Sequence, residues 1–288
     1  MDSPFQRIAI VGLGLIGGSW ALGLKRLRIR ARRVGCDRRA VLRLALSIGA
    51  IDEGWTNLAA AVRGADLVIL AAPVGTILEQ LSQLKPHVSP HALVTDTGST
   101  KEAICARARK LFSGGPLFLG GHPLAGKELS GFREADAALF KGARYALAPL
   151  EARDETDPRV RNFKKLVRAV GARPLVTDAA THDRAAAFLS HMPQLLSTGL
   201  ASVVARDVER GDLPLDFSAS GFRDMTRLAE SRFELWKDIS ATNRENIGAA
   251  LDLLIMKLRT IKAHLGGEAL AAEFERAAKL RRRLRGAK

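Results

Sequence analysis

The chain has 288 residues, of which 47% are hydrophobic, so it is long enough for one large domain or two ordinary ones and too apolar for general disorder. Its 45 Lys and Arg residues outnumber its 30 Asp and Glu residues and give a net charge of +15, which favours anionic partners. Aromatic residues make up only 5% of the chain, which argues against surfaces that stack nucleic-acid bases. We therefore expect an anionic small-molecule substrate and no nucleic-acid partner.

The cysteine and hydropathy patterns indicate the cellular compartment and whether the protein is associated with a membrane. Cys36 and Cys105 have no disulfide or metal-ligand spacing and suit small buried side chains in a reducing compartment. The uncharged run 8–24 contains glycines, lacks a basic lead-in and is shorter than the roughly 20 apolar residues that a membrane span needs. We expect a cytoplasmic protein with no membrane association and no metal site.

Short apolar runs alternate with helix-like segments over the first 177 residues. The alternation predicts an α/β Rossmann-type N-terminal domain, residues 1–177, with a parallel-rich sheet covered by helices. The predicted strands are 7–11, 33–36, 67–71, 93–95, 118–119, 143–148 and 173–176. The predicted helices are 17–27, 38–48, 75–84, 100–111 and 158–170, and 151–157 is a polar loop or hairpin.

The strand signal disappears after Thr177, which predicts an all-α C-terminal dimerisation domain over residues 178–288. A heptad seam is formed by Ile247, Leu251, Leu254, Leu258, Ile261 and Leu265, on a long helix that ends at a Gly-Gly pair. A last helix is predicted over 268–285, within a basic C-terminal tail. The seam fits a self-contained bundle or a dimer interface, and since it exceeds what a two-layer domain needs, we expect a homodimer.

A glycine trio, Gly12, Gly14 and Gly17, follows the first predicted strand directly, and Asp37 stands where the second strand should end. In this context the trio predicts a dinucleotide site: a tight turn, a close backbone approach to pyrophosphate, and close packing of the following helix. The helix N-terminus would face the phosphates, and Asp37 would accept hydrogen bonds from a ribose. The expected cofactor contacts are Gly12, Gly14, Leu15, Ile16, Gly17, Asp37, Arg38, Ala72 and Pro73.

The cofactor choice depends on Asp37 and its neighbours. A carboxylate repels a 2′-phosphate, so Asp37 favours NAD, whereas Arg38 and Arg39 could accommodate the phosphate of NADP if they turn inward. We expect NAD, with NADP possible.

Polar residues just after the later strands are candidates for chemistry, because ligands of such folds bind beyond the carboxyl ends of the strands. Ser99 and Thr100 begin a predicted helix, where either of them could simply be an N-cap. His122 lies in an apparent loop, Gly-Gly-His-Pro, which is an unusual setting for a packed histidine. A merely exposed histidine is the default alternative, but the flanking glycines and proline favour a functional role. An imidazole there can accept a proton from a substrate hydroxyl.

The helical half adds His191, Arg223 and Arg227. His191 could be a satisfied half-buried histidine. The two arginines are four residues apart on one predicted helix face, where Asp224 could neutralise one of them, or an arginine could bind a substrate carboxylate.

Together these segments resemble the prephenate/arogenate dehydrogenase family of tyrosine biosynthesis. The resemblance covers about residues 7–265 and rests on the blocks IAIVGLGLIGGS, VTDTGSTK, FLGGHPLAGKELSG, FLSHMPQ and GFRDMTRLAESRFELWKDI. It implies a dimeric enzyme that oxidises prephenate with NAD+ and releases carbon dioxide and 4-hydroxyphenylpyruvate. Arogenate or dual-specificity cyclohexadienyl dehydrogenase activity is the alternative.

The resemblance also implies roles for single residues. His122 would accept the hydrogen bond of the ring hydroxyl, and Ser99 would contact both that histidine and the hydroxyl. Arg227 would bind a substrate carboxylate, His191 would line the pocket, and Glu128 would gate or polarise its mouth. Trp236 and Asn243 match motif positions that helix packing explains equally well.

One departure from the family pattern concerns Gln194, where many members have a second histidine. Glutamine cannot become cationic, so its contact with the substrate side chain would be neutral. This leaves open the choice between prephenate and arogenate, and also feedback inhibition by tyrosine.

Two other readings are weaker. A β-hydroxyacid dehydrogenase would need a lysine base, for which Lys237 near Asn243 is a loose candidate, but it would leave the His122 segment unexplained. A dinucleotide-sensing nucleic-acid binder would explain the charge, yet the sequence has no helix-turn-helix or stacking motif.

Overall fold

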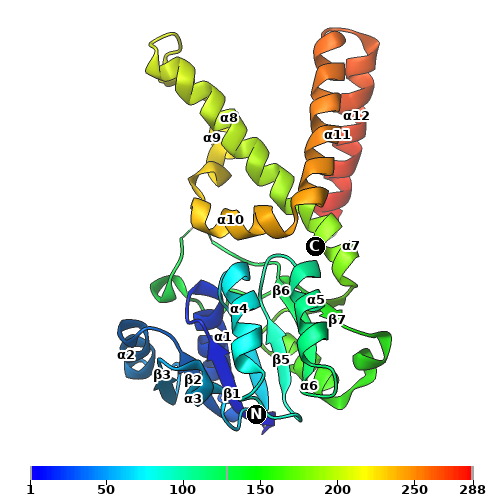
Figure 1. Cartoon of the computed structure of the whole chain (residues 1–288). Coiled ribbons are helices and arrows are strands. Elements are labelled where there is room, and N and C mark those ends of the chain that lie inside the picture. Colours follow the sequence, from blue (N-terminus) through cyan, green and yellow to red (C-terminus); the bar gives the residue numbers. More distant parts are fainter. Residues whose placement is uncertain (1, 128, 287–288) are drawn as a thin grey trace.

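An eight-stranded sheet occupies the lower part of the molecule (Figure 1). The computed structural model describes residues 2–127 and 129–286. The strands are β1 (Asp2–Val11), β2 (Arg30–Cys36), β3 (Glu53–Trp55), β4 (Leu67–Leu70), β5 (Leu93–Asp96), β6 (Leu117–Pro123), β7 (Arg144–Pro149) and β8 (Arg173–Val176). Their order across the sheet is β3-β2-β1-β4-β5-β6-β7-β8. Neighbouring strands are parallel except for β6 and β7, which pair antiparallel.

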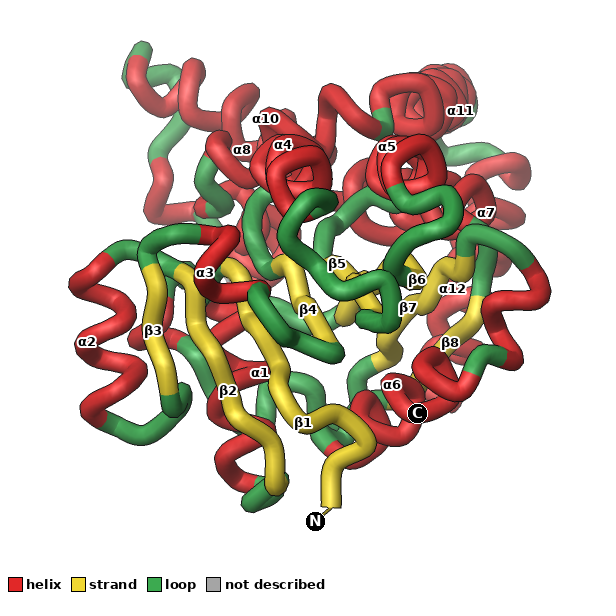
Figure 2. The backbone as a smooth tube through the Cα atoms, turned by 60° about the horizontal axis from the view of Figure 1, so that its bottom comes forward, coloured by secondary structure: helices red, strands yellow, loops and turns green. Residues whose placement is uncertain are grey.

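Helices cover both faces of the sheet (Figure 2). Successive side chains of a strand point to opposite faces, and β1 accordingly divides its residues between two cores. Ile8 and Ile10 pack with residues of α1 (Leu15–Arg26), α2 (Arg39–Ser47) and α6 (Pro158–Ala169). Ala9 and Val11 pack with residues of α3 (Leu58–Val62), α4 (Val74–Leu84) and α5 (Glu102–Leu111). Both faces of the central strands are therefore buried, which explains their continuous apolar sequence.

The remaining chain is helical and stands above the carboxyl ends of the parallel strands (Figure 1). Its helices are α7 (Ala179–Ala186), α8 (Met192–Glu209), α9 (Ser220–Thr226), α10 (Phe233–Thr242), α11 (Arg244–Ala263) and α12 (Glu268–Gly286). A π-helical turn, η3 (Ala187–His191), joins α7 to α8, and short 3₁₀ turns are η1 (Phe132–Glu134), η2 (Ala152–Thr156), η4 (Leu215–Phe217) and η5 (Arg227–Glu230). Helix α10 lies across the top of the sheet, while α8 and the α11–α12 pair project away from it.

The predicted fold class, a Rossmann-type α/β domain followed by helices, is confirmed, but several short elements were missed. The segment 52–62 carries strand β3 and helix α3, each too short to show a clear period. In addition, η2 occupies most of the predicted polar loop 151–157.

The prediction that His122 lies in a loop was wrong, because β6 runs on to Pro123 and His122 pairs with Ala146 of β7. The glycines before it suggested a loop. They are instead required by close neighbours in the sheet: a Cβ on Gly121 would lie 2.4 Å from the carbonyl oxygen of Asp96.

The alternative that Ser99 or Thr100 is simply a helix N-cap does not hold. Helix α5 begins at Glu102, and its N-cap residue is Lys101, which makes no side-chain capping bond. The carboxylate of Asp183, from α7, accepts the backbone N–H groups of Lys101 and Glu102 instead, at 2.6 Å and 2.9 Å. The cap of this helix is therefore a tertiary contact.

The predicted long and terminal helices correspond to α11 and α12, although α11 ends at Ala263 and leaves Leu265 of the seam in the following turn. None of the helices described is long and apolar enough to span a membrane.

Candidate functional site

The site begins where β1 and β4 lie side by side at the centre of the sheet. Strands β2 and β3 lie on one side of β1, and β4 to β8 lie on the other, so the chain changes winding direction between β1 and β4. In such sheets, ligands bind in the crevice beyond the carboxyl ends of these strands. The loops that follow β1 and β4 carry the predicted glycine segment and the segment of Ala72 and Pro73.

The three glycines of the first loop are in distinct environments. Gly12 has φ +89°, and a Cβ there would lie 2.4 Å from the carbonyl oxygen of Ala71. A Cβ on Gly17 would lie 1.9 Å from the carbonyl oxygen of Gly12. Around Gly14, in contrast, no atom lies within 4 Å of the Cβ position. The loop is tightly packed at both ends and open in the middle, which fits the close approach of a pyrophosphate.

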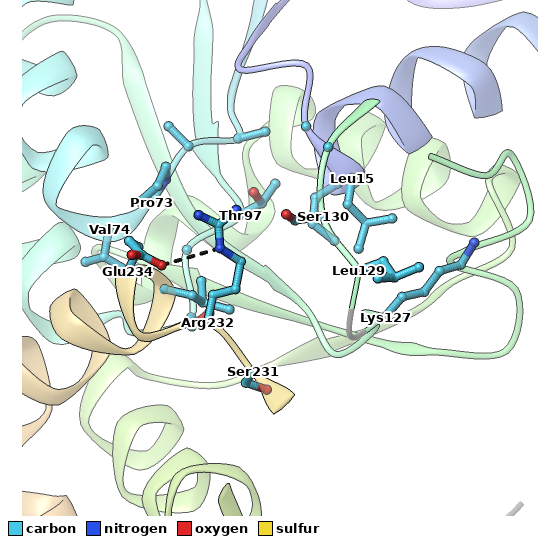
Figure 3. A pocket seen from close by; sticks show the side chains of 18 residues that line it. Leu15, Pro73, Val74, Thr97, Lys127, Leu129, Ser130, Ser231, Arg232 and Glu234 are labelled. Atoms are coloured by element: carbon cyan, nitrogen blue, oxygen red, sulfur yellow. Dashed lines mark ion pairs between the residues drawn. The ribbon is translucent and has the colours of Figure 1, made fainter. Parts of the chain in front are cut away.

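A cavity of about 420 Å³ opens over this loop (Figure 3). Its lining comes from the segments after β1, β4 and β5, from Lys127 and residues 129–131, and from the start of α10. The predicted cofactor or site residues among the lining are Gly14, Leu15, Ile16, Ala72, Pro73 and Ser99. Glu128, predicted at the mouth of the pocket, lies outside the described residues.

The helical part of the chain supplies one side of this cavity. Ser231, Arg232, Glu234 and Leu235 line it. Nε of Arg232 lies 3.4 Å from Oε2 of Glu234, the ion pair drawn in Figure 3. Both side chains are exposed, so this pair contributes little to stability. A ligand in the cavity would touch both the sheet region and the helical region.

Asp37 is bound to the backbone of the glycine loop. Its Oδ2 accepts the N–H of Leu13 at 2.6 Å, and its Oδ1 accepts the N–H of Arg38 at 2.6 Å. The side chain of Arg38 is 90% exposed, and its Nε lies 3.9 Å from Asp37 Oδ1. Asp37 and Arg38, with Gly12, line a separate hollow at the end of β2. The carboxylate thus faces the place where an adenosine ribose would lie, while Arg38 extends into solvent.

His122 belongs to a chain of hydrogen bonds that the sequence did not reveal. Its Nδ1 lies 2.9 Å from Nε2 of His182, and Nδ1 of His182 lies 2.7 Å from Oδ1 of Asp183. His182 and Asp183 are buried in the middle of α7. Among the described residues, no hydrogen bond joins Ser99 to His122. Burial lowers the pKa of His122 well below 6.5, assisted by the charges of His182, Lys101 and His191, so the ring is neutral at physiological pH.

A second histidine, His191, lies in the same network. The amide nitrogen of Asn243 donates to the carbonyl of Asp183 at 2.8 Å and to Nδ1 of His191 at 3.2 Å. Since Nδ1 accepts, Nε2 of neutral His191 carries the proton. The ring of Trp236 stands edge-on to His191, with centroids 5.7 Å apart. Burial lowers the pKa of His191 to about 4, although Asp183 opposes the shift.

A fully buried ion pair lies beneath these histidines. Lys101 and Asp96 are both inaccessible to solvent, and Nζ of Lys101 contacts Oδ2 of Asp96. Asp96 also accepts the N–H groups of Gly98 at 2.8 Å and of Gly121 at 3.0 Å. The pair thereby connects β5, β6 and the start of α5, and it places a positive charge near His122. Removing one partner of a buried pair typically costs about 3–5 kcal/mol.

Two polar contacts join the sheet region to α10. Oδ2 of Asp238 accepts the N–H of Gly75 at 2.8 Å, in the first turn of α4. The hydroxyls of Thr100 and Thr242 are 2.8 Å apart. Helix α10 therefore contacts the regions after β4 and β5, two of the three that line the cavity from the sheet side.

The structure brings some predicted residues together and leaves others apart. Gln194 is buried, and its amide donates to the carbonyl of Leu228 at 2.7 Å and accepts from Ser231 Oγ at 3.1 Å. Arg227 is exposed at the start of η5, and the arginine that lines the cavity is Arg232. The substrate roles of Gln194, Arg227 and Glu128 stay predictions.

Sequence reasoning missed His182, Asp183, Lys101, Asp238 and Arg232. The adjacent His-Asp pair was the only signal for the first two, and on a helix such a pair is normally a surface feature.

The described part of the chain holds no cluster of His, Cys, Asp and Glu side chains that could bind a metal ion.

Comparison with known proteins follows the two parts of the chain. The sequence model of the prephenate dehydrogenase nucleotide-binding domain matches residues 20–176, and that of the prephenate dehydrogenase dimerization domain matches residues 178–279. The chain belongs to the prephenate dehydrogenase family. It is therefore an NAD(P)-dependent dehydrogenase by family, as its glycine loop indicated.

Individual relatives cover nearly the whole chain. Prephenate dehydrogenase of Lactococcus lactis subsp. cremoris is 34% identical over 267 residues, 92% of this chain and 71% of the relative. Cyclohexadienyl dehydrogenase of Zymomonas mobilis is 31% identical over 286 residues, 96% of this chain and 95% of the relative. The crystal structure of A. aeolicus prephenate dehydrogenase, in complex with hydroxyphenyl propionate and NAD+, aligns with a TM-score of 0.85 at 29% identity, and covers 96% of this chain and 97% of the other.

Proposed function

We propose that this protein oxidises and decarboxylates prephenate to 4-hydroxyphenylpyruvate with NAD+ as the hydride acceptor. The observation that carries the proposal is a neutral, partly buried histidine, His122, on strand β6 and hydrogen-bonded to His182. Family membership supports it, as does the A. aeolicus relative with its bound NAD+ and hydroxyphenyl propionate.

The residues of the glycine loop fit the cofactor. The open space at Gly14 leaves room for a pyrophosphate at the N-terminus of α1, and Asp37 faces the ribose. When bound, NAD+ supplies the acceptor for the hydride that leaves the carbon bearing the ring hydroxyl. We infer NAD rather than NADP, because the Asp37 carboxylate repels a 2′-phosphate and Arg38 points into solvent.

Each site residue then has a separate role toward the substrate. His122 accepts the proton of the ring hydroxyl, and departure of the ring carboxylate as carbon dioxide leaves an aromatic product. Ser99 contacts the hydroxyl, and Arg227 binds a carboxylate. Glu128 gates or polarises the mouth of the substrate pocket. His191, with its proton on Nε2, offers a neutral hydrogen-bond donor to the substrate, and Gln194 lies at the side-chain end of the pocket.

We also infer a homodimer through the helical part, with the boundary between the two domains at residue 177. The family description of residues 178–279 as a dimerization domain supports this assembly. The charge of +15 suits an anionic substrate.

The test of the activity is NADH formation measured by absorbance, with prephenate and arogenate side by side and with NAD+ or NADP+. We expect turnover with prephenate and NAD+. Faster turnover of arogenate would assign the alternative substrate, a strong preference for NADP+ would reverse the assignment made from Asp37, and no turnover with either substrate would refute the function.

Replacement of the histidine tests its role. His122→Asn should lower kcat by roughly 100- to 10,000-fold, the range of general acid–base catalysis, while NAD+ still binds. His91→Asn, at an exposed position, is the matched control. Near-normal turnover of His122→Asn would remove the assigned role.

A further inference from the structure

The hydrogen bonds around His122 have a fixed direction, which begins at Asp183. Oδ1 of this carboxylate accepts the N–H of Lys101 at 2.6 Å, and Oδ2 accepts the N–H of Glu102 at 2.9 Å. A carboxylate bound by two backbone donors is an acceptor only. The nitrogen of His182 that faces it at 2.7 Å, Nδ1, must therefore carry a proton.

The direction then passes from His182 to His122. In a neutral imidazole one nitrogen donates and the other accepts, so a proton on Nδ1 of His182 leaves its Nε2 as an acceptor. Nε2 lies 2.9 Å from Nδ1 of His122, which must then be the donor. The remaining nitrogen of His122, Nε2, carries the lone pair, and the described part of the chain offers it no hydrogen-bond partner.

We propose that His182 and Asp183 are positioning residues that hold His122 in the tautomer with a free lone pair on Nε2. This inference rests on the proposed function, in which His122 accepts the hydroxyl proton. A free imidazole can carry its proton on either nitrogen, and a histidine with Nε2 protonated could not accept. As His122 takes up the proton, its Nδ1–H stays bonded to His182, and the carboxylate of Asp183 stabilises the resulting charge through the intervening ring.

The charges around His122 make the hydrogen bond to His182 important for stabilising a proton on its ring. Besides His182, the ionisable groups whose charges act on it are Lys101 at the start of α5 and His191 at the end of η3. Lys101 and His191 both disfavour a positive charge on His122. Among the hydrogen bonds of the described residues, the connection through His182 is the one that brings a negative charge to the His122 ring.

Two substitutions of His182 separate positioning from packing. In His182→Gln the side-chain amide reaches the position of Nε2, so its oxygen can still accept from His122. In His182→Asn the shorter amide reaches the position of Nδ1, so it can still donate to Asp183 but not reach His122. Both leave the carboxylate of Asp183 and its cap on α5 in place, and His182→Phe keeps only the ring volume.

The measurement is steady-state kinetics with prephenate and NAD+, with NAD+ binding and thermal unfolding as controls. We expect kcat to fall roughly 100-fold in His182→Asn and His182→Phe, with both KM values little changed, and His182→Gln to recover at least tenfold of that loss. A packing role predicts the opposite order, since His182→Asn preserves the contact with Asp183. That order, or equal activity of all variants and wild type, would overturn the proposal.

A second readout is independent of turnover. Nitrogen-15 NMR of ring-labelled histidine, assigned with His122→Asn, reports which nitrogen of His122 is protonated. We expect Nδ1 protonation in wild type and His182→Gln, and a shift toward Nε2 protonation in His182→Asn. Protonation on Nε2 in wild type would overturn the proposal even if the enzyme turns over prephenate. If the expected tautomer is found but no variant or wild type oxidises either substrate, the proposed function fails while the hydrogen-bond direction stands.

Discussion

Two histidines at the site, His122 and His191, both have a lowered pKa, and burial is the main cause for each. Burial, complete for His191 and partial for His122, lowers the pKa of each ring below the usual 6.5. For His122 the result is a base that is neutral whenever substrate arrives. For His191 it is a neutral donor rather than a cation. Both rings are therefore neutral before a substrate binds.

The low pKa of His191 predicts an acid-sensitive fold. The folded value, about 4, lies below the unfolded value near 6.5, so the unfolded chain binds the proton first as the pH falls. The free energy of unfolding should therefore decrease between pH 6.5 and pH 4, by at most about 1.4 kcal/mol per pH unit from this residue, and not change from this cause above that window. Urea unfolding across this range measures it, and His191→Gln should show a shallower slope. An unchanged slope in the variant would contradict the assignment.

At the scale of elements, the start of α4 depends on a different part of the chain. Its N-cap residue is Pro73, which has no side-chain acceptor, and Asp238 of α10 supplies the acceptor for the N–H of Gly75. The same turn carries Ala72 and Pro73 into the cavity. The position of a cofactor-facing loop is thus set by the helical part of the chain.

Removing this cap should weaken cofactor binding. Loss of an N-cap acceptor costs about 0.5–2 kcal/mol, so we expect Asp238→Ala to raise KM for NAD+ roughly 3- to 10-fold, with a smaller effect on kcat. Asp252→Ala, at an exposed position of α11, is the matched control. An unchanged KM for NAD+ in Asp238→Ala would show that the loop holds its position without α10.

How far the sequence predicts this structure depends on whether the signal is local. The alternation of strands and helices, the glycine loop and the helical second half are local patterns, and their existence could be read directly. Strand β3, at Glu53–Trp55, and helix α3 are too short for a period. His182 was missed because it lies 60 residues from its partner His122, and only the folded sheet and α7 bring them together. The cap on α5 was missed for the same reason.

At the scale of the whole molecule, the projecting helices expose much apolar surface. On α11, Leu253 is 50% exposed and Met256 57%, and on α12, Phe274 is 71% exposed. Part of the predicted heptad seam is instead used within the chain, since Ile247 packs with Ala187 of η3 and Ala250. Exposed apolar patches of this kind are typical of interfaces between subunits.

A charge on this surface should prevent dimerisation. We expect the double variant Leu253→Glu, Met256→Glu to sediment as a monomer in analytical ultracentrifugation at concentrations where the wild type is a dimer. Arg259→Glu, also exposed on α11, controls for the change of charge. A wild type that sediments as a monomer, or a double variant that still sediments as a dimer, would contradict the proposed interface.

The two thiols offer built-in reporters of local opening. Burial raises the pKa of Cys36 to about 11 and that of Cys105 to about 12, so very little reactive thiolate exists near neutral pH. Alkylation of each should therefore follow the rate at which its own element, β2 or α5, opens to solvent. Cys36 lines the hollow beside Asp37, so saturating NAD+ should slow its labelling more than that of Cys105. Comparing the two labelling rates would then distinguish opening of β2 beside the glycine loop, which depends on the cofactor, from opening of α5.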